Sequence, residues 1–379
     1  MSYVRSVFVL LGLTLTFANP SSTHANDDRV KVFILAGQSN MEGYGMLPSL
    51  EHLGQDPTFG HLLQELKQKD GAWAVRDDVT VYWKKDQGQP AHGPLSVEWG
   101  AMPGESIGPE LMFGTLMGQR YQQPVLLIKT AWGGKSVWCD FRSPSAGKMT
   151  WDERRILKRD DWLQPGKFYQ QMVSDIRECL GDLKEVVPGY QGQGYDLVGL
   201  VWLQGWNDYS EWHLQLDERR VGMGLIERYP HNLTAMFRDL RKDLAAPKLP
   251  IVIGELGVGG LEMNDRAKNP EDEEAVAMVR FREAQRAVAK DPTLKHVSFV
   301  PTVRFWDARL QELRLQADAY WDEKQRLGIE DTDENVLPTK PLNDEYWSRG
   351  GHWSCHYNGS AATYSLIGQA LANAFQDVD

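Results

Sequence analysis

Short apolar segments separated by helix-like segments set the pattern of this chain. Apolar runs rich in β-branched residues occur at 32–36, 79–83, 125–130, 197–203, 251–255 and 297–303. Most of them are continuous rather than alternating, which is typical of parallel strands buried on both faces. Helical periodicity lies between the runs, near 59–69, 108–121, 166–184, 230–245, 272–290 and 360–377. This alternation predicts a three-layer α/β/α sandwich with a mainly parallel central sheet.

The first 25 residues have the pattern of a secretory signal peptide. Arg5 precedes an apolar run at 7–17, and a polar stretch follows that ends in small residues. The run is too short to span a bilayer comfortably, so a retained anchor is the less favoured alternative. We therefore expect a secreted or periplasmic protein without stable membrane insertion. Residues 26–379 are expected to form a single domain, with the charged segment near 304–350 as an insertion beside the active face.

The charge of the chain indicates which partners to expect, and its cysteine content indicates whether disulfide bonds stabilise it. The chain has 41 Lys and Arg against 52 Asp and Glu, a formal net charge of −11. An acidic protein lacks the electrostatic footprint for phosphate backbones, so nucleic acid is not an expected partner. The three cysteines, Cys139, Cys179 and Cys355, are an odd number and imply no disulfide framework. Their pairing and the oligomeric state stay open.

The loop that follows the first predicted strand has candidate catalytic chemistry. Ligands on parallel sheets bind at the carboxyl ends of strands, which makes the loops after each strand the place to look. The loop at 37–41 places Ser39 there, flanked by Gln38 and Asn40. Ser39 is a candidate nucleophile, and the alternative is a turn serine that caps the next helix.

A second polar loop follows the strand expected at 197–203. It contains Asn207 between Gln204 and Asp208. An Asn amide at a strand end can donate a hydrogen bond to a developing oxyanion. The alternative is that Asn207 and Asp208 only satisfy their own turn.

The third candidate is His356, directly before the last predicted helix. A general base needs a pKa near the operating pH, which favours a His on a loop at the edge of the sheet. His352 and Cys355 lie nearby and raise the alternative of a metal site. No second ligand pair at zinc spacing accompanies them, so no metal is expected.

Together these blocks resemble the SGNH hydrolase superfamily. More narrowly, the chain resembles its sialate O-acetylesterase-type branch, which includes the carbohydrate acetylesterases of family 6. The resemblance rests on Gly-Gln-Ser-Asn-Met at 37–41, Gly-x-Asn-Asp at 205–208 and a His before the last helix. The segment 129–136 resembles the family's glycine block. The resemblance spans nearly the whole mature chain and implies an SGNH or flavodoxin-like sandwich that needs no cofactor.

The resemblance also implies a role for each residue that matches a family motif. Ser39 is the expected nucleophile and His356 the expected base. The expected oxyanion hole consists of the backbone N–H groups of Ser39 and Gly134, with Gly133 close behind, and the Asn207 side chain. Four neighbouring residues are expected to support the site: Gln38, Asn40, Gln204 and Asp208.

Two departures from the family pattern leave the third triad member open. Relatives often have His-Gln-Gly-Glu where this chain has Leu-Gln-Gly-Trp at 203–206. The superfamily's Asp normally lies three residues before the catalytic His, and Trp353 occupies that position here. The chain thus forms either a Ser-His dyad or a triad with an acid from elsewhere, for which Asp344 and Glu345 are weak candidates. His352 remains a rival base.

The resemblance implies a carbohydrate O-acetylesterase that works through an acyl-serine intermediate. An O-acetylated glycan is the expected substrate, and the particular sugar stays open. Two alternatives are a catalytically inactive glycan-binding module and an esterase of the same superfamily that acts on another ester class. Trp132, Trp138, Trp206 and Trp212 lie in or beside the predicted loops, where they either stack on sugar rings or pack in the core.

Overall fold

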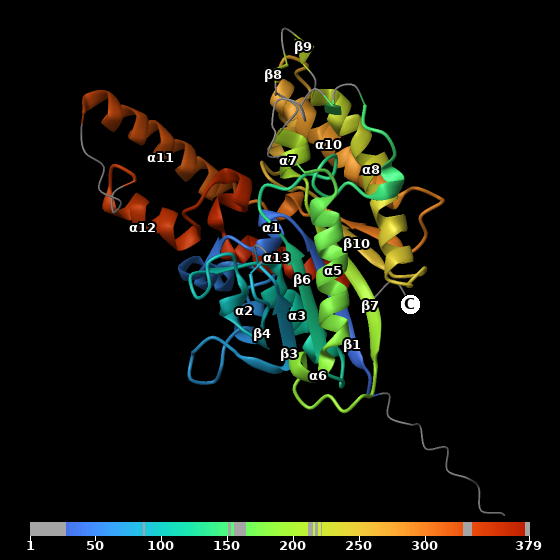
Figure 1. The fold of residues 1–379 in the computed structure, drawn as a ribbon. Helices are drawn as coiled ribbons and strands as arrows, with labels where there is room; N and C mark the ends of the chain where they lie inside the picture. Colours follow the sequence, from blue (N-terminus) through green and yellow to red (C-terminus); the bar gives the residue numbers. More distant parts are fainter. Residues whose placement is uncertain are drawn as a thin grey trace, which may run out of the picture.

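The central sheet has seven strands in the described part of the chain (Figure 1). The computed structural model describes residues 28–85, 88–150, 153–154, 164–210, 215–216, 219–220, 222–328 and 336–375, so the expected signal peptide lies outside the described residues. The spatial order is β11-β10-β7-β1-β6-β3-β4. In chain order the strands are β1 (Val30–Gly37), β3 (Arg76–Trp83), β4 (Ala91–Leu95), β6 (Val125–Ala131), β7 (Tyr195–Leu203), β10 (Ile251–Gly254) and β11 (Val297–Val300).

The apolar runs form strands because helices cover both faces of the sheet. Every residue of β1 and β6 is buried, which explains why their sequences are continuously apolar. All six predicted strands are confirmed, and neighbouring pairs among them are parallel. The edge strand β4 pairs antiparallel with β3 and was not predicted, because its sequence contains Gly93 and Pro94 and is mostly exposed.

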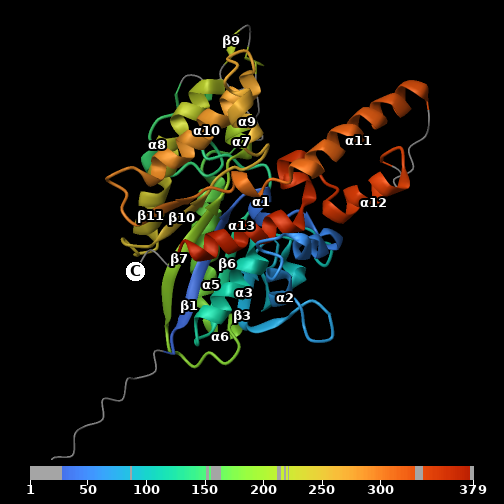
Figure 2. The ribbon, with the colours of Figure 1, turned by 180° about the vertical axis from the view of Figure 1, so that it is seen from behind.

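Helices on the two faces complete the three layers, so the predicted fold class is confirmed. Helices α5 (Lys167–Gly181) and α8 (Gly222–Asp243) cover one face, and α3 (Pro109–Arg120) and α13 (Ala361–Asn373) cover the other (Figures 1 and 2). An aromatic contact joins the sheet to the helices on each face. The ring centroids of Phe33 of β1 and Phe113 of α3 are 5.3 Å apart, and those of Trp202 of β7 and Phe237 of α8 are 6.0 Å apart. The long helices of these layers are α3 (Pro109–Arg120), α5 (Lys167–Gly181), α8 (Gly222–Asp243), α10 (Glu273–Ala289) and α13 (Ala361–Asn373).

Shorter elements connect these layers. The short helices are α1 (Ser39–Glu42), α2 (Leu62–Glu65), α6 (Leu183–Val186), α7 (Trp206–Ser210) and α9 (Glu262–Arg266). The 3-10 segments include η1 (Leu47–Gln55), η5 (Val303–Phe305) and η6 (Ser354–Gly359). Two small antiparallel pairings are formed by β2 (Gly45–Met46) with β5 (Ser106–Ile107) and by β8 (Gln215–Leu216) with β9 (Arg219–Arg220). Among the described residues, no helix has the length and apolar character needed to cross a membrane.

The segment expected to be an insertion forms two helices that project from the body as an arm. Helix α11 (Ala308–Leu327) and helix α12 (Lys340–Arg349) lie side by side (Figures 1 and 2). Their contact has a small apolar cluster of its own, made of Leu310, Leu313, Ala317, Leu337 and Tyr346. The base of α11 adjoins the loop that contains His356, because Arg314 of α11 donates to the His352 carbonyl at 3.1 Å.

The three cysteines are not joined by disulfide bonds. All three lie in the described part of the chain, with Cys139 and Cys179 buried and Cys355 partly exposed. The folded state is therefore held by its apolar core rather than by covalent cross-links.

Candidate active site

The candidate site lies where the strand order reverses in the sheet. Strand β1 sits between β6 and β7, and a crevice opens at such a reversal beyond the carboxyl ends of the strands. Gly37 at the end of β1 pairs in register with Ala131 of β6 and Leu203 of β7. The three strand ends are thus level, and the loops that contain Ser39, Gly134 and Asn207 leave from one edge.

A glycine at the end of β1 is required to place Ser39. Gly37 has φ +156°, and a Cβ there would lie 2.1 Å from the Leu203 carbonyl oxygen. No other residue can make this turn against β7. Ser39 then begins α1 and is 6% exposed. The glycine block is beside it, because a Cβ built on Gly133 would lie 3.8 Å from the Ser39 Cβ.

Gly134 is the exposed residue of the glycine block. It adopts φ +70°, and a Cβ at this position would meet no atom within 4 Å. The backbone here borders open space beside Ser39 rather than packed side chains. This arrangement leaves room for a substrate atom next to the block.

Gln38 joins the nucleophile loop to the Asn207 loop. Its Nε2 donates to Asn207 Oδ1 at 2.9 Å, and its Oε1 accepts from the Gly205 backbone N–H at 3.0 Å. The first bond holds the Oδ1 atom of Asn207 toward Gln38, so the NH2 group of Asn207 points away from Gln38. A half-exposed Asn with a fixed amide orientation is suited to donate a hydrogen bond to a substrate oxygen.

Asn40 joins the nucleophile loop to the histidine loop. Its Nδ2 donates to the Cys355 carbonyl at 3.0 Å, and its Oδ1 accepts from the Tyr364 hydroxyl at 2.6 Å. Because Tyr364 lies on α13, Asn40 connects the start of α1 both to the loop that contains Cys355 and to helix α13. The structure therefore brings the segments of Ser39 and His356 together through buried polar contacts.

His356 is a buried imidazole whose neighbours are aromatic rings and a second His. Its ring stacks on Tyr44 with a centroid distance of 4.1 Å and an interplanar angle of 9°. Its Nδ1 lies 3.1 Å from Nδ1 of His352. Burial, with a smaller contribution from His352, lowers the pKa of His356 to about 4. The ring is therefore neutral at pH 7, which is the state in which it can accept a proton, but its pKa lies below the range near the operating pH expected of a general base. Sequence reasoning gave no signal for Tyr44.

The two acidic candidates for the third triad member are engaged elsewhere. Asp344 forms an ion pair with Lys340 at 2.7 Å, and Glu345 pairs with Arg309 at 2.8 Å. Neither makes a hydrogen bond to His356 in the described part of the chain. Trp353, in the family's Asp position, stacks on His356 at 6.0 Å and offers it no carboxylate.

Asp208 and Gln204 hold the backbone at the end of the glycine block and directly after it by hydrogen bonds. The Asp208 carboxylate accepts from the backbone N–H groups of Val137 at 2.8 Å and Trp138 at 3.1 Å. Gln204 Nε2 donates to Asp208 at 2.6 Å and to the Lys135 carbonyl at 3.0 Å. Burial raises the pKa of Asp208 to about 7. These two side chains hold the loop after β6 against the loop after β7.

The tryptophans near the predicted loops divide between core and cleft. Trp132 and Trp138 are fully buried, so they are core residues and cannot stack on a sugar. Trp206 is half-buried and lines a cavity of about 220 Å³ together with Trp306. Trp212 lies outside the described residues.

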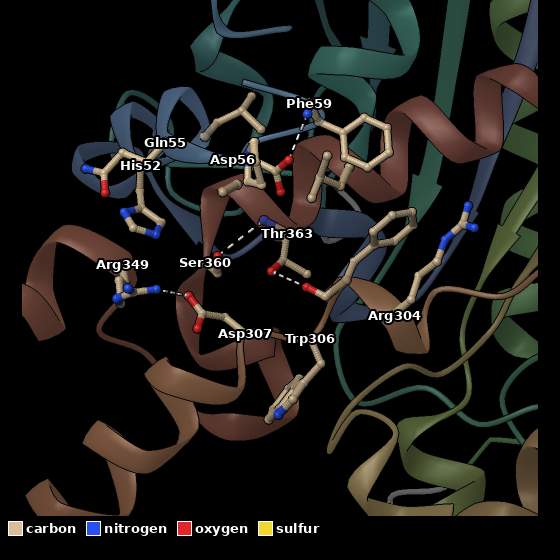
Figure 3. Close-up of a pocket in the computed structure, with 15 residues that line it drawn as sticks. His52, Gln55, Asp56, Phe59, Arg304, Trp306, Asp307, Arg349, Ser360 and Thr363 are labelled. Atoms are coloured by element: carbon tan, nitrogen blue, oxygen red, sulfur yellow. Dashed lines mark hydrogen bonds and ion pairs between the residues drawn. The ribbon is translucent and has the colours of Figure 1, made fainter. Parts of the chain in front are cut away.

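A second cavity, of about 440 Å³, lies beside the starts of α11 and α13 (Figure 3). His52 of η1 and Trp306 line it, and the ion pair of Arg349 with Asp307 at 3.0 Å closes one side. Its lining includes none of the predicted catalytic side chains. Within the described residues, no group of three His, Cys, Asp or Glu side chains is arranged to hold a metal ion.

Comparison with known proteins identifies the family. The model for the carbohydrate esterases described as sialic acid-specific acetylesterases matches residues 29–305, more than half of the chain. The chain belongs to this carbohydrate esterase family. The protein is accordingly an ester hydrolase of the carbohydrate esterase class. The matched range includes the loops of Ser39, Gly134 and Asn207 and ends before His356.

Individual relatives of this carbohydrate esterase are distant. A probable carbohydrate esterase of Arabidopsis thaliana is 23% identical over 236 residues, which are 61% of this chain and 70% of the relative. A solved structure of an Arabidopsis thaliana protein covers 93% of this chain and 100% of its own at 17% identity and a TM-score of 0.44. A carbohydrate acetylesterase from Xanthomonas citri covers 92% of this chain and 56% of its own at 13% identity and a TM-score of 0.44.

Proposed function

We propose that this carbohydrate esterase removes O-acetyl groups from glycans through an acyl-serine intermediate. The observation that supports this most is that the segments of Ser39, the glycine block, Asn207 and His356 adjoin one another at the reversal point of the sheet. Each comes from a different segment of the chain, and Gln38 and Asn40 link them by hydrogen bonds. A nucleophile, a neutral base and oriented N–H donors are the parts that acyl transfer needs.

The proposed reaction has two steps. His356 Nε2 takes the proton of the Ser39 hydroxyl as its oxygen attacks the ester carbonyl. The resulting oxyanion accepts hydrogen bonds from the backbone N–H groups of Ser39 and Gly134 and from Asn207 Nδ2. The sugar alcohol leaves with the proton from His356, which forms the acyl-serine. A water molecule, deprotonated by the same His, then attacks the acyl-serine and releases acetate and Ser39.

The cavity beside Trp206 supports a sugar as the leaving group. Trp206 adjoins Asn207 in the chain, and Ser354, two residues before His356, also lines the cavity. Trp306 supplies a second aromatic side chain, and Glu262 and Gln311 are among the polar residues that line the cavity. Aromatic side chains together with polar groups suit a sugar ring, whose faces are apolar and whose edge bears hydroxyls.

Export is part of this proposal. Residues 1–25 would direct secretion or periplasmic delivery, and residues 26–379 would act as one domain with the α11–α12 arm as its insertion. Amino-terminal sequencing of the exported protein tests this directly. Recovery of a chain that begins at Met1 would contradict it.

The test of function is acetate release from acetylated xylan and from O-acetylated sialic acid. Wild type, Ser39→Ala and His356→Ala are compared on both substrates. We expect activity in wild type that falls by at least about 10³-fold in each variant. Activity that survives in Ser39→Ala would show that another residue is the nucleophile. Faster cleavage of long-chain than of short-chain aryl esters would favour the alternative of an esterase for another ester class.

A further inference from the structure

We propose that His352 is the positioning partner of the catalytic base, in the role that a carboxylate fills in most serine hydrolases. In this arrangement His352 Nδ1 accepts a hydrogen bond from the Nδ1–H of His356. The inference rests on the proposed function, because it concerns how His356 acts as the base. It also explains how the site can work although neither Asp344 nor Glu345 reaches that ring.

The geometry of the pair allows a single bridging proton. The two Nδ1 atoms are 3.1 Å apart, and the ring centroids are 4.9 Å apart. One nitrogen must donate and the other must accept. If the proton is on His356 Nδ1, its Nε2 keeps a lone pair for the Ser39 hydroxyl. If the proton is on His352 Nδ1, neutral His356 has its own proton on Nε2 and cannot act as a base. Catalysis therefore requires His352 as the acceptor, with its proton on Nε2.

The backbone around His352 is fixed by the arm and by a tight turn. The His352 N–H donates to the Asn358 carbonyl at 3.0 Å, and its carbonyl accepts from Arg314 at 3.1 Å. The chain between the two histidines and α13 passes through left-handed conformations at Tyr357 and Asn358, both with φ +51°. Asn358 is held in turn by Gln311 of α11 at 3.0 Å. A turn this constrained is stored strain of the kind that collects at functional sites.

The charges around the pair disfavour a second proton. Arg314 of α11, itself paired with Asp318, faces His352, and the Tyr44 ring contacts both imidazoles. The partly exposed Cys355 thiol is on the same loop. Burial and the Arg314 charge lower the pKa of His352. Together these groups keep both rings neutral at pH 7, which is the state with one bridging proton.

Three substitutions at position 352 separate a positioning role from a structural one. His352→Asn keeps an acceptor, because the Asn Oδ1 can occupy the place of Nδ1. His352→Leu removes the acceptor, and His352→Asp adds a negative charge. We expect kcat within about 10-fold of wild type for Asn and a loss of about 10²–10⁴-fold for Leu, since an unsupported base adopts the wrong tautomer. His92→Leu, on the exposed strand β4, is the control and should leave kcat unchanged.

The pH profile gives the readout that a structural role would not move. An adjacent carboxylate favours the protonated imidazole, so His352→Asp should move the acid limb of kcat/KM to higher pH, by about one to three pH units. The proposal is overturned if folded His352→Leu keeps wild-type kcat and pH profile, or if Asn loses as much as Leu. Loss of activity in folded His352→Asn with retention in His356→Asn would instead make His352 the base.

A spectroscopic measurement judges the pair without any turnover. Nitrogen-15 NMR of the imidazole rings at pH 7 should show His356 protonated at Nδ1 and His352 protonated at Nε2. The opposite assignment would overturn the proposal. If wild type hydrolyses no acetyl ester, the proposed function fails, and the tautomers still decide whether His352 is the acceptor.

Discussion

The Gln38–Asn207 hydrogen bond makes a prediction about transition-state stabilisation. Gln38 is 1% exposed, and its Nε2 holds Asn207 Oδ1 at 2.9 Å. In a Gln38→Leu variant the Asn207 amide loses the bond that sets its orientation. Its NH2 group is then no longer directed at the position of the oxyanion. The expected consequence is a lower kcat with little change in KM, because the donor acts mainly in the transition state.

The magnitude follows from the contacts that are lost. Removing one oxyanion donor typically costs ~10²–10³ in kcat, about 3–4 kcal/mol, which is the upper limit for disordering Asn207. The same substitution leaves the buried Gly205 N–H without its acceptor at 3.0 Å, which should lower the free energy of unfolding by about 1–3 kcal/mol. Urea unfolding measures this second effect separately from kinetics.

A double-mutant cycle on an aryl acetate is the decisive assay. Once Asn207→Ala has removed the amide, Gln38 has nothing left to orient. The double variant Gln38→Leu/Asn207→Ala should therefore have the kcat of Asn207→Ala to within about threefold. Multiplicative losses in the double variant would refute the reasoning, and so would a folded Gln38→Leu enzyme with wild-type kcat.

Three further predictions concern pH and buried charge. Because the pKa of His356 is lowered to about 4, kcat/KM should stay level from pH 7 to pH 5 and fall only near pH 4. A pH–rate profile with an acid limb near pH 6.5 would contradict this. Lys129→Met removes the Nζ atom that lies 3.1 Å from the buried Glu110 carboxylate, so urea unfolding should show a free energy of unfolding lower by about 3–5 kcal/mol. The double variant Lys129→Met/Glu110→Gln should recover part of this stability. Burial raises the folded-state pKa of Asp208 to about 7, so its contribution to the free energy of unfolding is fully present below about pH 4 and is lost as pH rises to 7. The free energy of unfolding of Asp208→Asn should lack this decline, and an equal slope against pH in wild type and variant would argue against it.

Most of the sheet could be predicted from sequence because its strands are buried on both faces. A continuous apolar run such as that of β6 has one physical explanation at this length. Strand β4 could not be found in this way, since an exposed edge strand with Gly93 and Pro94 has no apolar pattern. The helix expected at 59–69 is shortened to α2 (Leu62–Glu65), because the segment before it forms turns around Asp56.

The candidate site could be predicted only as far as strand ends and motifs reach. Ser39, Gly134 and Asn207 follow strands whose order in the sheet brings them together. The contact of His352 with His356 depends on the left-handed turn at 357–358 and on Arg314 from α11, neither of which leaves a periodic signal. Trp138 shows a further limit, because its position beside a candidate catalytic loop does not indicate that its ring is buried.

The place of α13 in the fold fixes when a newly made chain can become active. Phe375, just after α13, packs on Phe33 of β1 at 5.4 Å, and Tyr364 of the same helix bonds to Asn40. The Ser39 loop leaves the ribosome well before His356 and the helix that anchors its loop. A nascent or truncated chain that ends before residue 350 contains Ser39 but lacks His356, the proposed base. With the proposed roles of Ser39 and His356, hydrolysis begins only after the His356 segment has been made and has docked on the Ser39 loop, so the order of synthesis delays the activity.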